Sequence, residues 1–362
     1  MGPGRTGSSL VHVHPGPSYS PIAPWPGSGR PAAWPLPPVR DTHPSRPLLV
    51  AAGCYLLALG LTSGVFLWTR AGQWLDGLLL PRAERGGGYE QRTVLVGPAR
   101  AVLDVFGSPT VLAALLGSVL LVGLLGRRLV AGVVGVGMVL GAVAVAGVAK
   151  SVLLRPDYQI ESSTTHNSFP SGHVTAATAL LMAFLLVLPG WARPWLAVPG
   201  AAAVSVVASA TMIAGWHRFS DTLGGVLLGA VLCCLAAAAL AARRGDAGPG
   251  DADETRAGPR RAALIGAVLG LVVLVWALLA VVPRLAASVE PGPLAAIVAT
   301  TVLTTVTVVA VLFPLRTTDF RDRTNRRNFR DPTNRPERPG PGRNVENRYG
   351  AARVEAGSAP WN

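Results

Sequence analysis

Apolar runs of membrane length recur along this chain and restrict it to a helical architecture. A bilayer core needs about 20 apolar residues of helix, and in lipid each segment must satisfy its own backbone polar groups. Some runs are shorter than this, which tilt or longer helix ends can absorb. We therefore expect an all-α, polytopic membrane helix bundle. The eight expected spans are Leu48–Thr69, Pro109–Leu125, Leu129–Val148, Val174–Leu188, Trp195–Ile213, Thr222–Ala242, Ala262–Val282 and Leu294–Leu312.

Composition agrees with a membrane protein, because 50% of the 362 residues are hydrophobic and only 14% are charged. The net charge of +13 could indicate a nucleic-acid partner. However, the arginines concentrate in tails and short loops, and no basic patch is interleaved with aromatic side chains. We expect the lipid bilayer, and no nucleic acid, as the partner. Cys54, Cys233 and Cys234 lie inside apolar runs and are expected to be small buried residues.

The two ends of the chain differ in composition from its middle. Residues 1–46 are rich in Pro, Gly and Ser without periodicity, which predicts a disordered tail. Because the C-terminal tail is also polar, we expect that its removal after Arg316 leaves the chemistry of the core intact. The expected order after residue 46 is a six-helix membrane core at 47–242, a cytoplasmic linker at 243–261, two additional transmembrane helices at 262–313 and a disordered Arg-rich tail at 314–362.

Arginine placement sets the expected orientation. Arg127 and Arg128 separate the second and third spans, and further arginines fill the linker and the C-terminal tail. With both tails cytoplasmic, all three groups lie inside, as the positive-inside rule requires. The arginines between the first and second spans then lie outside and run against the rule. We expect a multi-pass plasma-membrane protein with both tails cytoplasmic.

Reactive side chains gather at the ends of three spans, on the face that this orientation makes extracytoplasmic. Lys150 follows the third span and is itself followed by Arg155. The run Pro170-Ser171-Gly172-His173 opens the fourth span, and His217 with Asp221 opens the sixth. Polar groups at the ends of membrane helices are candidate functional residues.

The spacing within these groups indicates chemistry on a phosphate. Four residues apart on a helix, His217 and Asp221 share a face, so the carboxylate can fix the tautomer of the imidazole. The Pro-Ser-Gly turn leaves helix N–H groups available for an anion, and its glycine allows close backbone approach. Lys150 and Arg155 supply positive charge. One histidine can attack phosphorus while the other, His173, protonates the leaving oxygen.

Each group alone also fits an ordinary role as a helix cap, a turn or an interfacial lysine. Loop polarity is enough to explain His166 and Asn167, which precede the second group. The three groups together, each at a span boundary and all on one face, favour a phosphoryl-transfer site.

In this order the groups resemble the motifs of the type 2 phosphatidic acid phosphatases, the PAP2 superfamily, which is related to vanadium haloperoxidases. Lys150 with Arg155-Pro156 resembles the first motif. Pro170-Ser171-Gly172-His173 matches the second, and His217 with Asp221 matches the end of the third. The resemblance implies a six-helix phosphatase core, to which this chain adds two further C-terminal helices.

The resemblance covers roughly Leu48 to Ala242 and includes two departures from the family pattern. Four residues separate Lys150 from Arg155, where the family usually has six. Ala210 and Thr211 occupy the Ser-Arg positions of the third motif, so one phosphate-binding arginine is absent from its usual place.

The resemblance also implies roles for individual residues. His217 would be the nucleophile that forms a phosphohistidine, Asp221 would orient it, and His173 would be the general acid. The implied activity is hydrolysis of a lipid phosphate, such as polyprenyl diphosphate, phosphatidate or phosphatidylglycerol phosphate, with no metal or cofactor. The absent arginine leaves an alternative, a catalytically weak or inactive member that binds or moves phospholipid. The residues that would bind phosphate are Lys150, Arg155, Ser171 and Gly172.

Overall fold

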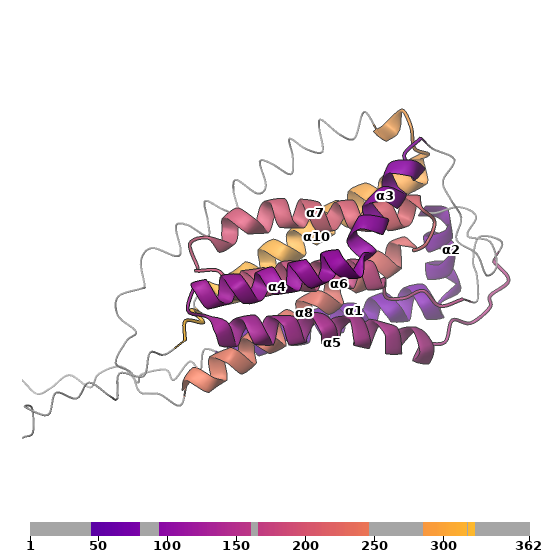
Figure 1. Ribbon diagram of the computed structural model, residues 1–362. Helices are drawn as coiled ribbons and strands as arrows, with labels where there is room; N and C mark the ends of the chain where they lie inside the picture. The colour runs from indigo at the N-terminus through magenta and orange to yellow at the C-terminus, as the bar shows by residue number, and fades with distance from the viewer. Residues whose placement is uncertain (1–44, 80–93, 161–165, 246–284, 317, 323–362) are drawn as a thin grey trace, which may run out of the picture. The chain divides into compact units, whose positions relative to one another are not determined.

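The computed structural model describes residues 45–79, 94–160, 166–245, 285–316 and 318–322, and within these ranges it contains helices and no strand. Most of the helices lie side by side in one bundle (Figure 1). Their bounds are α1 Arg46–Trp68, α2 Arg70–Leu79, α3 Val96–Gly107, α4 Pro109–Leu125, α5 Leu129–Val152, α6 Gly172–Val187, α7 Arg193–Ile213, α8 Phe219–Gly245 and α10 Pro291–Leu315.

The expected all-α membrane bundle is confirmed. Among the described residues, α1, α5, α7, α8 and α10 are long and apolar enough to cross a membrane. The pair α3 and α4, bent by 57° at its break, is a sixth candidate, and α6 is a shorter apolar helix. Each expected span in the described ranges corresponds to one helix, while Ala262–Val282 lies outside them.

Two helices, α2 and α3, occupy the stretch between the first and second expected spans. Neither has a membrane-length apolar run of its own, since α2 has 10 residues and α3 has 12. Both lie at one end of the bundle (Figure 1). Cys54 also differs from expectation, because it is exposed on α1, whereas Cys233 and Cys234 are buried on α8.

Helix α6 is the centre of the bundle and is buried along almost its whole length. Glycines on α8 allow it to approach α6 closely. A Cβ atom on Gly225 would lie 3.0 Å from the carbonyl oxygen of Ser171, and one on Gly229 would lie 2.7 Å from Cγ2 of Thr178. The start of α6 is therefore packed directly against the first turns of α8.

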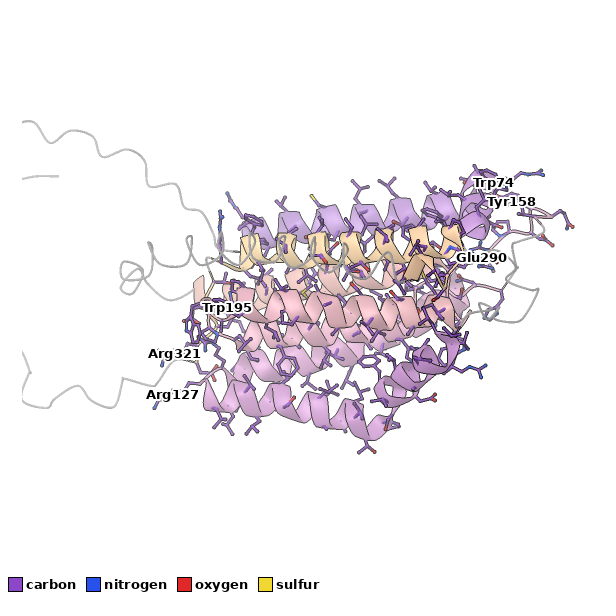
Figure 2. All side chains as sticks on the ribbon, turned by 90° about the horizontal axis from the view of Figure 1, so that it is seen from above. Trp74, Arg127, Tyr158, Trp195, Glu290 and Arg321 are labelled. Atoms are coloured by element: carbon purple, nitrogen blue, oxygen red, sulfur yellow. The ribbon has the colours of Figure 1, made fainter. Side chains whose placement is uncertain are left out.

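The opposite end of the bundle is closed by residues 318–322, which we call the C-terminal strap. Figure 2 shows Arg127, Trp195 and Arg321 at this end, and Trp74, Tyr158 and Glu290 at the other. The guanidinium of Arg193 on α7 donates to the carbonyl oxygens of Leu315 and Thr318, and it lies 5.5 Å from the ring centroid of Phe320. The strap thus holds α10 against α7.

The strap also caps α5, whose N-cap residue Arg128 makes no side-chain cap of its own. Arg128 instead pairs with Asp319, with Nη2 2.7 Å from Oδ1. The carboxylate of Asp322 accepts hydrogen bonds from the backbone N–H groups of Leu129 and Val130 at 2.5 and 3.4 Å. Residues 318–322, which belong to the expected tail at 314–362, thus contact the bundle, and residues 323–362 lie outside the described residues.

We expect two C-terminal truncations to differ in stability. A chain ending at Asp322 keeps the cap on α5 and should unfold in detergent at the wild-type temperature. A chain ending at Arg316 loses the cap and the Asp319 ion pair, which should lower stability by about 1–2 kcal/mol. Because the strap lies at the end of the bundle opposite α2 and α3 (Figures 1 and 2), both truncations should leave the chemistry expected of the core intact at low temperature. Equal unfolding temperatures would contradict the role of the strap.

Candidate active site

The three groups of reactive residues meet where α5 ends and where α6 and α8 begin. The backbone N–H of Ser171, the N-cap of α6, donates to the carbonyl oxygen of Asp221 at 2.9 Å. A Cβ atom on Gly172 would lie 3.8 Å from Nζ of Lys150, in the last turn of α5. Residues that are far apart in the sequence are therefore brought together at one end of the bundle.

The turn between α7 and α8 places His217. Gly215 has a φ of 72°, a conformation that favours glycine, and its N–H donates to Met212 while the N–H of Trp216 donates to Thr211. This pattern is the Schellman motif that commonly ends a helix. The N–H of His217 donates to the same Thr211 oxygen at 3.2 Å. Thr211, at the position of the absent arginine, thus contributes its backbone to the turn.

His217 and Asp221 form a buried pair. Nδ1 of His217 lies 3.4 Å from Oδ2 of Asp221, whose side chain is fully buried. The same carboxylate oxygen accepts hydrogen bonds from the hydroxyl of Ser168 at 2.5 Å and from the N–H of Arg218 at 2.9 Å. A carboxylate beside Nδ1 fixes the ring tautomer and leaves Nε2 available for chemistry.

His173, in the first turn of α6, is the second histidine of the site. Its ring centroid is 5.7 Å from that of Trp216 and 6.5 Å from that of Phe106. Trp216 directly precedes His217 in the chain, and a Cβ atom on Gly172, which directly precedes His173, would lie 3.8 Å from Nζ of Lys150. A Cβ atom on Gly107, the last residue of α3, would lie only 3.3 Å from Nε2 of His173. The end of α3 therefore borders the ring nitrogen that faces away from the backbone.

Two arginines supply buried positive charge. Arg155 follows α5, is 6% exposed, and places Nη2 4.0 Å from Oδ2 of Asp76. Burial and the charge of Arg218 lower the pKa of Arg155 to about 10, so its guanidinium stays charged at neutral pH. Arg218 is also buried, and its charge acts on Arg155, Asp76 and Asp221. The residue after His217 thus adds a second guanidinium near the site.

Asp76 on α2 brings a second carboxylate to the same place. It is fully buried and accepts hydrogen bonds from the N–H and the hydroxyl of Ser220 at 3.1 and 2.6 Å. Burial and the nearby charge of Asp221 raise the pKa of Asp76 to about 6, against the opposing effects of Ser220, Arg218 and Arg155. The motifs do not contain this residue.

The sequence analysis missed several residues of the site. Ser168 and Arg218 lie within a few residues of the motifs, and Ser220 directly precedes Asp221, so proximity in sequence could have indicated them. Asp76 is 144 residues away from Ser220 and carries no sequence signal. Asn167, assigned to loop polarity, has a structural role, because its side-chain amide donates to the Leu153 carbonyl at 2.8 Å. His166 is exposed.

These features define a multi-pass helical membrane protein with a buried His–Asp pair and a second histidine beside it. Residues 135–244 match the family model of the PAP2 superfamily, and this segment contains all three motifs. The resemblance drawn from the motifs is thereby confirmed, and α2 with Asp76 lies outside the matched segment. No curated protein and no solved structure matches the chain. Within the described ranges, no group of three or more His, Cys, Asp or Glu side chains could hold a metal ion.

Proposed function

We propose that this protein is an integral membrane phosphatase that hydrolyses the phosphomonoester or diphosphate of a lipid. The observation that carries the proposal is the buried pair of His217 and Asp221, which stands beside His173 and two guanidinium groups. The PAP2 superfamily match supports the reaction class. Polyprenyl diphosphate, phosphatidate and phosphatidylglycerol phosphate are the substrate candidates.

In the first step, Nε2 of His217 attacks phosphorus, and the bond from phosphorus to the leaving oxygen breaks. His173 gives its proton to that oxygen, so the lipid product leaves as a neutral alcohol or, from a diphosphate, as a monophosphate. Asp221 stabilises the positive charge that develops on the imidazole. The product of this step on the enzyme is a phosphohistidine.

In the second step, water attacks the phosphohistidine while His173, now neutral, takes a proton from it. The bond from phosphorus to nitrogen breaks, and inorganic phosphate and free His217 are formed. Lys150, Arg155, Ser171 and Gly172 hold the phosphoryl oxygens in both steps, through two side-chain cations, a hydroxyl and the start of α6.

The bundle supports a substrate that stays in the bilayer. Large apolar side chains are exposed on α1 and α5, where they suit contact with lipid. Arg127 and Arg321 lie at the end opposite the site (Figure 2), and the positive-inside rule assigns such an end to the cytoplasm. The lipid head group then reaches His217 from the extracytoplasmic side, with both tails of the chain cytoplasmic.

We expect the purified full-length protein in detergent to release phosphate from at least one member of a lipid panel, and to do so equally in EDTA. The panel contains the three candidate substrates, and the nucleophile is a side chain, so the mechanism needs no metal-bound hydroxide. Activity lost on chelation and recovered with Mg²⁺ would contradict the mechanism. A protein that binds these lipids without turnover would support the inactive lipid-binding alternative.

A further inference from the structure

Helices α1 and α2 each donate one hydrogen bond to the loop that carries Arg155, on either side of that residue. The indole N–H of Trp68, at the end of α1, donates to the carbonyl oxygen of Leu154 at 2.8 Å. The side-chain amide of Gln73 donates to the carbonyl oxygen of Pro156 at 3.0 Å. The backbone is therefore held by one hydrogen bond before Arg155 and one after it. Asp76, three residues after Gln73, faces the Arg155 guanidinium.

Asp76 links this loop to α8. Its carboxylate accepts both hydrogen bonds from Ser220, in the first turn of α8, and Oδ2 is the oxygen nearest to Arg155. Helix α8 presents His217 just before its start and Asp221 in its first turn. One side chain thus joins the cation of the first motif to the helix of the third motif.

A fully buried carboxylate is costly unless charged or polar partners compensate for its lost hydration. The two hydrogen bonds from Ser220 could be accepted by a neutral amide oxygen or hydroxyl. The negative charge itself is matched only by cations, and the cations whose charge acts on Asp76 are Arg155 and Arg218. The hydrogen bonds from Ser220 at the start of α8 therefore do not explain why residue 76 is charged. The two arginines do.

We propose that Asp76 is a positioning residue of the phosphate site, which orients Arg155 from a helix outside the family segment. The inference rests on the proposed function, since Arg155 is taken to bind the transferred phosphoryl group. It also accounts for the shortened spacing between Lys150 and Arg155, because α2 supplies the anchor that holds the displaced guanidinium.

The test uses full-length protein in detergent and two readouts, lipid turnover and protection from thermal unfolding by inorganic phosphate. Asp76→Asn keeps the size of the side chain and removes its charge. We expect KM and the dissociation constant of phosphate to rise about tenfold, within the coupling range of contacting residues, while kcat falls less. Asp104→Asn, which removes an exposed carboxylate on α3, is the matched control and should change neither.

A double-mutant cycle separates positioning from a purely structural role. In an Arg155→Ala background, Asp76→Asn should no longer affect phosphate affinity, because the group through which it acts is gone. Asp76→Asn that lowers only the unfolding temperature, or that weakens phosphate binding equally in both backgrounds, would overturn the inference, as would a wild type that phosphate does not protect. Phosphate protection that depends on Asp76 in a protein without lipid turnover would preserve the inference and reject the proposed function.

Discussion

His217→Ala should abolish phosphate release from every lipid substrate and prevent formation of an acid-labile phosphoenzyme. The variant removes the nitrogen that is proposed to attack phosphorus, which belongs to the imidazole held 3.4 Å from the Asp221 carboxylate. The expected loss of kcat is on the order of 10⁶-fold, the scale seen when a covalent hydrolase loses its nucleophile. Rapid quench with a labelled lipid phosphate measures both the phosphoenzyme and the turnover.

The matched control for this variant is His166→Ala, since His166 is an exposed histidine on the loop that precedes α6. It should retain wild-type turnover. Both variants should unfold at similar temperatures, because the Asp221 carboxylate keeps its hydrogen bonds from Ser168 and from the N–H of Arg218 when the imidazole is removed. Wild-type turnover in His217→Ala would reject the phosphohistidine mechanism, and a phosphoenzyme that still forms would assign the nucleophile to another residue.

The membrane bundle could be predicted from the sequence because apolar periodicity is not needed to recognise a helix in lipid. Length and apolar content suffice, since a lipid-exposed segment must satisfy its own backbone. The span Pro109–Leu125 coincides with α4, and the other described spans differ from their helices by a few residues at one or both ends. Helices α2 and α3 could not be predicted in this way, because they are short and do not each span a bilayer.

Sequence indicated the groups that sit within motifs and missed those that depend on tertiary contact. Ser171, His173, His217 and Asp221 could be predicted because turn chemistry and helical spacing are local properties. Asp76 reaches Ser220 only after α2 has packed at the end of the bundle, and nothing near Asp76 in the sequence indicates this. Its contact with Ser220 is a property of the fold alone.

The departures from the family pattern have a physical account in the structure. Thr211 replaces an arginine, yet Arg218 is buried nearby and its charge acts on Asp221. Arg155 stands two positions early, yet its guanidinium reaches Asp76 beside the start of α8. Two buried guanidinium groups are thus retained near Asp76 and Asp221 at shifted positions, which supports the proposed activity over the inactive alternative.

His173→Ala should slow lipid hydrolysis by about 10²–10⁴-fold, the usual contribution of a positioned general acid. A lipid alcohol is a poor leaving group and needs a proton as its bond to phosphorus breaks. Nitrophenolate is stable without that proton, so nitrophenyl phosphate should still phosphorylate His217 in the variant. The measurement compares the pre-steady-state rate of phosphorylation by the lipid and by nitrophenyl phosphate in the wild type and in His173→Ala.

Hydrolysis of the phosphohistidine should also be slowed in His173→Ala. Water attack on the phosphohistidine also uses His173, now as the base, so the variant should accumulate phosphoenzyme when it is given nitrophenyl phosphate. The time course should show a rapid burst of nitrophenol that approaches one equivalent per enzyme, followed by slow release of phosphate. The wild type should show no such burst if hydrolysis of the intermediate is fast. Equal losses on both substrates without accumulated phosphoenzyme would show that His173 holds the phosphate rather than transferring protons. The His173 ring lies beside Trp216 and the end of α3, and substrate binding alone would then have to explain this position.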